Sequence, residues 1–290
     1  METAGNLMTV GIALLLFTIA AYWLRPRSLR FLQHYGLERD NFAGQRIPSM
    51  SGIYIWLLTV LYGVLWIILE RMLGPQTESR LLTSLLFPLL WYQSIIFVIG
   101  WLDDTIGTTA VKGFKGHLGA VFKEKQFTTG ILKAGGTGIV ALTVVLQWNL
   151  PFQQGVLAFL LMAFMTNTIN LLDVRPGRAM KGYGFLMFAA LMFAAEPVLP
   201  FLLMFPVIIS VLMLFPLDVR GKAMLGDTGS NLLGFSAGYT AAFTAPLWVQ
   251  IGLLVGCVYL HWIAERSSIS KLIENNALLR WLDRIGRVHG

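Results

Sequence analysis

The sequence predicts an all-α protein, a polytopic membrane helix bundle of about nine transmembrane helices in one domain, with its N-terminus outside. Three observations predict this class. Of 290 residues, 56% are hydrophobic and only 13% are charged, whereas a soluble globular domain carries roughly 25% charged residues. Apolar stretches long enough to cross a bilayer recur along the chain. The basic residues lie between these stretches, mostly in alternate loops.

The net charge of +7 would also be compatible with nucleic-acid binding. A nucleic-acid-binding protein, however, concentrates its basic residues on a soluble module, whereas here they are spread between apolar runs. We therefore expect a membrane, and no nucleic acid, among the partners. Cys257 is the only cysteine and lies inside an apolar run, so we expect neither a disulfide framework nor a paired-thiol metal site.

The individual helices are predicted from stretches of about 20 mostly apolar residues. The first stretch is followed by Arg25, Arg27 and Arg30 and has no basic residue before it, so we interpret it as a membrane helix and not as a cleaved signal peptide. The sixth stretch is shorter than the others. In chain order the nine predicted spans are 7–24, 52–69, 83–102, 131–148, 155–172, 183–195, 199–216, 230–245 and 247–264.

The loops between these spans carry charges that predict the orientation. With the N-terminus outside, the inner loops are 25–51, 103–130, 173–182 and 217–229, followed by the inner tail 265–290. All of the 22 Lys and Arg residues then fall on the inner side, including Lys133 at the inner end of its helix, except Arg71 and Arg80. Because cytoplasmic loops carry the excess of Lys and Arg, this split predicts an odd number of spans and a cytoplasmic C-terminus.

The tail 265–290 has the pattern of an amphipathic helix. Its apolar positions recur with Trp281 and several arginines among them; they are Ile269, Leu272, Ile273, Leu279, Leu282 and Ile285. Such a helix can lie on the inner leaflet of the membrane. It can equally pack on the loops of its own chain, and the sequence leaves both alternatives open.

Aspartates gather at the inner ends of the predicted spans. Five of them have this position: Asp103, Asp104, Asp173, Asp218 and Asp227. Carboxylates at the membrane boundary are costly to desolvate and therefore indicate functional sites, although each one could instead cap a helix or pair with a nearby Lys or Arg. The adjacent Asp103 and Asp104 repel each other, and a divalent cation such as Mg²⁺ is the simplest compensation.

Two further strings carry polar groups to the same side. Asn167, Asn170 and Asp173 follow each other at intervals of three, which places them on one face of the fifth predicted span. They either bond across the bundle or reach a substrate or metal. The string from Gly226 to Ser230 opens the eighth span, where glycines allow close backbone approach and a helix N-terminus favours an anion; the alternative is a tight turn capped by Asp227.

Together these strings resemble the polyprenyl-phosphate N-acetylhexosamine-1-phosphate transferases (glycosyltransferase family 4), of which this chain would be a divergent member. The resemblance covers most of the chain and keeps the motif order. The matching segments are the Pro-containing loop Arg46 to Gly52, the acidic pair Asp103-Asp104, Lys133 at the start of the next helix, the N-x-x-N-x-x-D string ending at Asp173, and the K-x-x-x-G-D-x-G-S string from Lys222 to Ser230.

The resemblance implies an Mg²⁺-dependent transferase of the bacterial plasma membrane with a cytoplasmic active site. In this chemistry a polyprenyl phosphate attacks the sugar-linked phosphorus of a UDP-sugar, UMP leaves, and a lipid-linked pyrophosphoryl sugar remains for cell-envelope polymer synthesis. We expect an N-acetylhexosamine, in the first instance GlcNAc, as the sugar. A homodimer is compatible with this assignment.

The resemblance also implies roles for individual residues. It assigns metal binding to Asp227 and Asp104, and catalysis to Asp103, Asp104 and Asp173. The expected substrate-binding residues are Arg46, Lys133, Asn167, Asn170 and Lys222. An apolar groove between helices would accept the prenyl chain.

The chain also departs from the family pattern. Where the family commonly continues with D-G-x-D-G, Val174 replaces the first glycine and Pro176 the second aspartate. The His-rich loop near the C-terminus is absent, with only His261 nearby, and so is the family's last helix. These departures keep a catalytically degenerate relative, which binds a lipid carrier or organises a cell-envelope complex, as the alternative. A transporter ranks last, because the charges cluster at one interface and no internal repeat is found.

Overall fold

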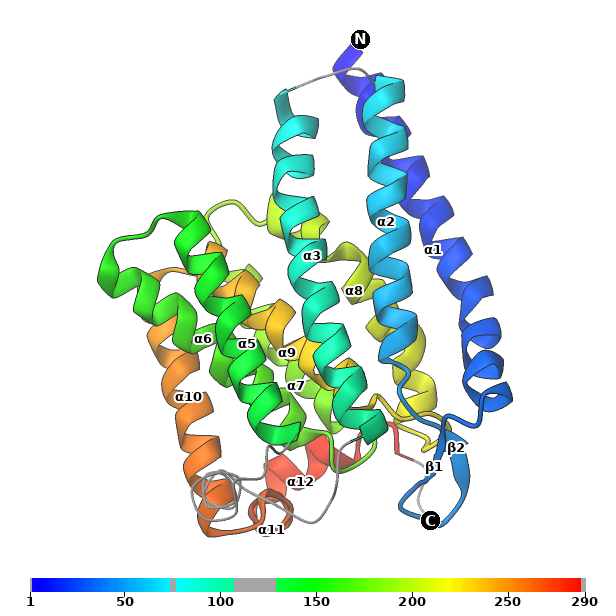
Figure 1. Cartoon of the computed structure of the whole chain (residues 1–290), viewed down its shortest axis with the longest axis vertical. Coiled ribbons are helices and arrows are strands. Elements are labelled where there is room, and N and C mark those ends of the chain that lie inside the picture. Colours follow the sequence, from blue (N-terminus) through cyan, green and yellow to red (C-terminus); the bar gives the residue numbers. More distant parts are fainter. Residues whose placement is uncertain (1, 74–76, 107–128, 288–290) are drawn as a thin grey trace.

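The computed structural model describes residues 2–73, 77–106 and 129–287 and consists of helices with one small hairpin (Figure 1). Of the predicted inner loop 103–130, residues 107–128 lie outside this described part. The elements in chain order are α1 (Glu2–His34), β1 (Glu38–Asp40), β2 (Arg46–Pro48), α2 (Gly52–Leu73), α3 (Thr77–Ile106), α5 (Thr129–Trp148), α6 (Phe152–Leu172), α7 (Arg178–Met192), α8 (Val198–Asp218), α9 (Gly226–Thr244), α10 (Leu247–Arg266), α11 (Ile269–Asn275) and α12 (Ala277–Arg284).

The described part is a helical bundle suited to a membrane. Six of its helices are long and apolar enough to cross a bilayer, namely α1, α2, α3, α6, α8 and α10. Each of the nine predicted stretches lies largely within a helix, which confirms the all-α class. The other three helices, α5, α7 and α9, are shorter or less apolar, so the number of nine crossings stays a prediction.

Helix α9 lies at the centre of the bundle, which explains its polar composition. Every residue from Thr228 to Ala241 is buried. A Cβ added at Gly234 would lie 2.5 Å from the backbone of Thr166, and one at Gly238 would lie 2.7 Å from Met162. Small residues of this kind let membrane helices approach closely. Because α9 faces other helices along its buried length, it does not need an apolar surface.

The described parts of the predicted inner loops gather at one end of the bundle, which is the lower end in Figure 1. The hairpin pairs β1 with β2 in antiparallel register, with Arg39 opposite Ile47. The loop before α2 pairs with the loop before α9, because the backbone N–H of Ser51 donates to Met224 at 3.0 Å and that of Met224 donates to Pro48 at 2.9 Å. The Pro-containing loop and the glycine-rich string therefore lie side by side.

The C-terminal tail docks on the start of α7. Arg178 donates to both carboxylate oxygens of Asp283, at 3.0 and 3.1 Å. Lys181 donates to the backbone carbonyls of Leu282 and Asp283, and Arg287 donates to the carbonyl of Pro176 at 2.9 Å. Of the two alternatives for the tail, packing on the protein's own loops is therefore present, but it uses the polar side of α12.

Candidate functional site

A polar cavity of about 320 Å³ lies at the end of the bundle where these loops meet. Its walls come from the hairpin, the end of α3, the loop between α6 and α7, and the segment that leads from α8 into α9. Five aspartates and two arginines are among the lining residues: Asp40, Asp104, Asp173, Asp218, Asp227, Arg39 and Arg175. Acidic residues from well-separated parts of the sequence thus share one cavity.

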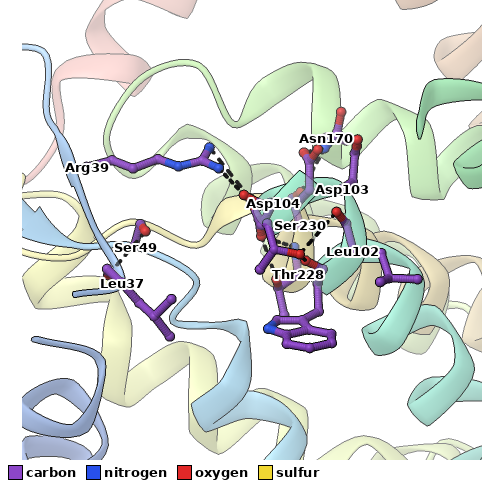
Figure 2. A network of polar contacts seen from close by, with 12 residues as sticks. Leu37, Arg39, Ser49, Leu102, Asp103, Asp104, Asn170, Thr228 and Ser230 are labelled. Atoms are coloured by element: carbon purple, nitrogen blue, oxygen red, sulfur yellow. Dashed lines mark hydrogen bonds and ion pairs between the residues drawn. The ribbon is translucent and has the colours of Figure 1, made fainter. Parts of the chain in front are cut away.

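Asp104, near the end of α3, binds the first turn of α9 (Figure 2). Its Oδ2 accepts from the backbone N–H of Thr228 at 2.8 Å and also from the Thr228 hydroxyl, while Oδ1 accepts from the backbone N–H of Asp227 at 3.1 Å. The first N–H groups of a helix have no partner within the helix, and a carboxylate there also interacts favourably with the helix dipole. Asp104 therefore caps α9 from another helix.

Glycines make this close approach possible. A Cβ at Gly226 would lie 2.7 Å from Oδ2 of Asp104, and the φ of Gly226 is +69°, a conformation that residues with a side chain rarely adopt. A Cβ at Gly100 would lie 2.6 Å from the carbonyl oxygen of Asp227, and one at Gly52 would lie 2.3 Å from the backbone of α9. The ends of α2, α3 and α9 thus meet backbone to backbone.

A second polar cluster surrounds Asp227. The ammonium nitrogen of Lys133, from α5, lies 3.4 Å from Oδ2 of Asp103 and 3.2 Å from Oδ1 of Asp227. Asn170, from α6, donates to the Asp227 carboxylate and, at 3.0 Å, to the hydroxyl of Ser230. Four helices thus contribute to one cluster, in which a positive charge sits between two carboxylates.

Asp173 follows the last turn of α6 and faces the same cavity. Burial of its carboxyl group raises the pKa of Asp173 well above the usual range, and the nearby carboxylates of Asp218, Asp227 and Asp104 raise it further. Asp218 itself accepts a hydrogen bond from the backbone N–H of Gly177 at 2.6 Å. Because like charges and desolvation both disfavour the ionised form, a cation that enters the cavity would stabilise it.

Sequence reasoning did not single out Arg39 as a site residue. Arg39 donates to the backbone carbonyl of Asp104, and its guanidinium lies 3.8 Å from Oδ1 of that residue. The hairpin that carries Arg39 is held over the cavity because Asn41 donates to the carbonyl of Gly221 at 2.9 Å. The turn residues Asn41 and Gly44 indicate a reversal of the chain here, but the sequence does not tell on which residues the hairpin lies.

Three of the expected substrate-binding residues lie away from the lining of the cavity. The amide of Asn167 faces the Nε2 atom of His261 at 2.7 Å, so it bonds across the bundle to α10. Arg46 and Lys222 are exposed, in β2 and in the segment before α9, and neither is among the lining residues of the cavity. Lys133 and Asn170 adjoin the cavity through their contacts with Asp227.

The donor atoms of the site suit Mg²⁺, which keeps water and phosphate ligands, better than a metal ion that is held by protein side chains alone. Among the described residues, no group of three or more His, Cys, Asp or Glu side chains could hold a metal ion. Mg²⁺, however, commonly takes one or two carboxylates and completes its coordination shell with water and phosphate oxygens. Asp103 and Asp227 offer such a pair, and the ammonium group of Lys133 between them marks a place where positive charge is favoured.

Comparison with known proteins adds no family assignment. No protein-family model matches the chain, and no curated protein matches it. The class that the fold defines is therefore a helical membrane bundle. What its candidate site can do is therefore inferred from the arrangement of the site residues.

Proposed function

We propose that the protein transfers a sugar-1-phosphate, N-acetylhexosamine-1-phosphate, from a UDP-sugar to a polyprenyl phosphate and releases UMP. The observation that carries this proposal is the single cavity in which Asp104, Asp173 and Asp227 meet Arg39 and Arg175. A diphosphate substrate needs cationic side chains to hold its oxygens and carboxylates to hold a divalent cation. The resemblance of the motifs to the polyprenyl-phosphate transferases supports the same reaction.

In this proposal Asp227 and Asp103 would hold Mg²⁺, which when bound neutralises charge on the diphosphate. Arg39, from the hairpin, and Arg175, from the loop after α6, bind phosphate oxygens. Lys133 offsets part of the charge of the two carboxylates and would pair with the negative charge that develops on the leaving UMP. An oxygen of the acceptor phosphate attacks the sugar-linked phosphorus, and the bond to the UMP oxygen breaks, so positioning and charge neutralisation supply the catalysis.

Asp104 has a different role in this scheme. Its carboxylate is occupied by donors from the start of α9, so we assign it to positioning Asp227 and not to the metal. Asp173 faces the cavity with its carboxyl group desolvated, and it is the group of the site best placed to respond to a bound cation. In this scheme Asp104 therefore has a structural role, and Asp173 takes part in binding the cation and substrate.

The lipid acceptor needs an apolar path along the bundle. A groove of about 300 Å³ lies between α2 and α3, with Gly63 at its floor and Val64, Ile67 and Trp91 among its lining residues. A Cβ at Gly63 would meet Leu90 at 2.5 Å, so the small residue brings the helices together there. A groove of this chemistry suits a hydrocarbon chain.

The direct test uses the purified full-length chain in detergent with radiolabelled UDP-GlcNAc and a polyprenyl phosphate. We expect UMP release that requires Mg²⁺ and disappears with EDTA. The Asp227→Asn variant should lose about 100-fold or more in rate, as expected when a charge-stabilising group is removed, whereas Glu196→Gln, exposed in the link between α7 and α8, should keep wild-type activity. No UMP release from any UDP-N-acetylhexosamine, or full activity of Asp227→Asn, would contradict the proposal.

One observation favours the alternative of a degenerate, lipid-carrier-binding relative. The carboxylates of Asp103 and Asp227 already share an ion pair with Lys133, and that of Asp104 already accepts hydrogen bonds from the start of α9. This alternative expects polyprenyl phosphate to bind without turnover, and binding that is insensitive to Asp103→Asn and Asp227→Asn. Equilibrium binding of the labelled lipid, measured beside the UMP assay, separates the two functions.

A further inference from the structure

We propose that α12 binds the surface of an anionic lipid bilayer and, through its contacts with the 173–178 loop, positions one wall of the polar cavity. The proposal does not depend on the reaction that takes place in the cavity. It rests on the exposed face of α12, the positive charges on the polar side of the tail, the position of the tail at the end of a membrane helix, and the contacts behind the loop.

The first observation is an apolar face of α12 that no other described residue covers. Leu278, Trp281 and Leu282 follow the spacing of one helix face, and Ile285 comes directly after the helix; the four side chains are 64%, 62%, 42% and 44% exposed. None of the residues of α12 is buried. A contiguous apolar patch of this kind on a short helix indicates a binding surface, because leaving it in water is unfavourable.

The second observation is the positive charge on the polar side of the tail. Arg280 and Arg284 are exposed on the same helix, and Lys271 is exposed on the preceding helix α11. An amphipathic helix with basic residues on its polar face binds anionic lipids by burying apolar area and pairing its charges with headgroups. Trp281 adds an amphipathic ring of the type that is enriched at membrane interfaces. This charge pattern favours a lipid surface over another apolar protein.

The third observation is position. Helix α11 begins three residues after α10, a helix long and apolar enough to span the membrane, has ended at Arg266. At that end the guanidinium of Arg266 lies 4.2 Å from the ring centroid of Trp262, and Trp262 is half exposed. An exposed Trp beside an Arg is typical of the boundary between hydrocarbon and water. Figure 1 places α11 and α12 at this end of the bundle, so α12 lies at the level of the membrane surface.

The fourth observation connects the helix with the cavity. Asp283, on the polar side of α12, is held by Arg178 and by Arg287, the latter at 2.8 Å. Arg287 also holds the carbonyl of Pro176. Pro176 and its neighbours from Asp173 onward line the cavity. A bilayer that fixes the apolar side of α12 would therefore fix this wall through the polar side.

The first experiment maps the surroundings of α12 in the full chain with single nitroxide labels in a Cys257→Ala background. The protein is placed in nanodiscs of phosphatidylcholine with phosphatidylglycerol. We expect labels at 278, 281, 282 and 285 to collide with oxygen more than with a water-soluble nickel complex, and labels at 280 and 284 to show the reverse. In nanodiscs of phosphatidylcholine alone this contrast should decrease.

Three outcomes of this mapping contradict the proposal. Equal access of the nickel complex to labels on both faces would show that α12 stands in water. Dipolar broadening between labels at 281 of two copies would show that a second copy of the chain covers the face. An unchanged contrast without phosphatidylglycerol would also contradict the predicted preference for anionic lipid.

The second experiment tests the connection to the cavity with a label at position 174, in the cavity wall. We expect Trp281→Glu to increase the mobility of this label in nanodiscs but not in detergent, and Asp283→Asn to increase it in both. The control variant Ser268→Glu adds the same charge to an exposed position of the tail outside α12 and should leave the label unchanged. An immobile label in the nanodisc-bound Trp281→Glu protein would overturn the proposed connection.

Discussion

At the scale of single residues, Asp104 and Asp103 are adjacent acids with different tasks. Asp104 gives both of its oxygens to the first turn of α9, whereas Asp103 pairs with Lys133. In Asp104→Asn the amide has one oxygen only, so one set of donors from α9 meets an NH₂ group instead of an acceptor. We expect a loss of about 1–3 kcal/mol in stability, measured as a lower Tm of the detergent-solubilised protein.

The neighbouring variant Asp103→Asn is the matched control for this prediction. Its amide oxygen can still accept from Lys133, and the carboxylate that accepts from the first N–H groups of α9 is that of Asp104. Its Tm should therefore fall by clearly less than that of Asp104→Asn. If both variants lose the same stability, the capping role of Asp104 is wrong.

Gly226 is the residue at which adding a single methyl group should lower the stability of the fold most. Its φ is +69° and an added Cβ would lie 2.7 Å from the Asp104 carboxylate, so Gly226→Ala combines backbone strain with the displacement of the cap. We expect a loss of at least about 1–2 kcal/mol. Gly184→Ala is the control, because no atom lies within 4 Å of the added Cβ and alanine favours a helix by about 1 kcal/mol. Thermal unfolding of the two variants should move in opposite directions.

At the scale of elements, the sequence predicted the helices well because hydrophobic length is a local property. It also predicted that the strings around Asp103, Asn170 and Asp227 belong together, because all three stand at the ends of their helices that were predicted to face the inner side of the membrane. It did not predict that α9 is enclosed by other helices, since a buried helix in a membrane protein can be rich in Gly, Ser and Thr without a lipid-facing apolar stripe.

Among the elements, α12 is the one whose docking on α7 should depend most on pH. Burial raises the pKa of Asp283, but hydrogen bonds from Arg178 and the charges of Arg178, Arg287 and Lys181 outweigh it, so that the pKa of the docked residue is lowered. A carboxyl group with a lowered pKa stabilises the docked state fully above its ordinary pKa of about 4, and this contribution is lost as the pH falls through the lowered value.

The mobility of a nitroxide at position 278, measured in detergent from pH 7 to about pH 2, gives a direct record of this docking. We expect a sharp increase in mobility only at the acidic end of the range. Asp283→Asn removes the titrating group, and its label should be mobile throughout with no such step. A step of the same size in Asp283→Asn would assign the pH dependence to another group.

At the scale of the whole molecule, long-range contacts account for what the sequence left out. Arg39 reaches Asp104 because the hairpin folds over the cavity, whereas Arg46, the basic residue of the recognised motif, is exposed at the start of β2 and does not line the cavity. Likewise, Asn167 shares a helix face with Asn170 but contacts His261 on α10. Spacing along a helix identifies a face, and only the packing of the other helices decides which partner each residue on that face meets.

The residues that meet at the cavity support the predicted number of membrane crossings. If only the six long apolar helices crossed the bilayer, the end of α6 and the start of α9 would lie on opposite sides of the membrane. Asp173 and Asp227, which stand at these two positions, instead line one cavity with Asp104. Helices α5 and α7 would then have to cross as well. Because Arg287 of the tail donates to Pro176 beside the cavity, α9 would also have to cross, so that α10 ends on the same side. We therefore predict nine crossings, with the N-terminus outside as the loop charges indicate.

Single cysteines at three exposed positions, each in a Cys257→Ala background, test this topology with a membrane-impermeant maleimide on spheroplasts. With nine crossings and an outer N-terminus, a cysteine at Gln153 should be labelled from outside, and cysteines at Gln45 and Glu274 should be labelled only after the membrane is permeabilised. With six crossings, Glu274 would become reactive from outside and Gln153 would not, while Gln45 would stay protected.

Because an inverted nine-helix protein would in addition expose Gln45, the three positions separate the number of crossings from the orientation. Labelling of Glu274 in intact spheroplasts would contradict the cytoplasmic position of the tail, and with it the placement of the cavity on the inner face.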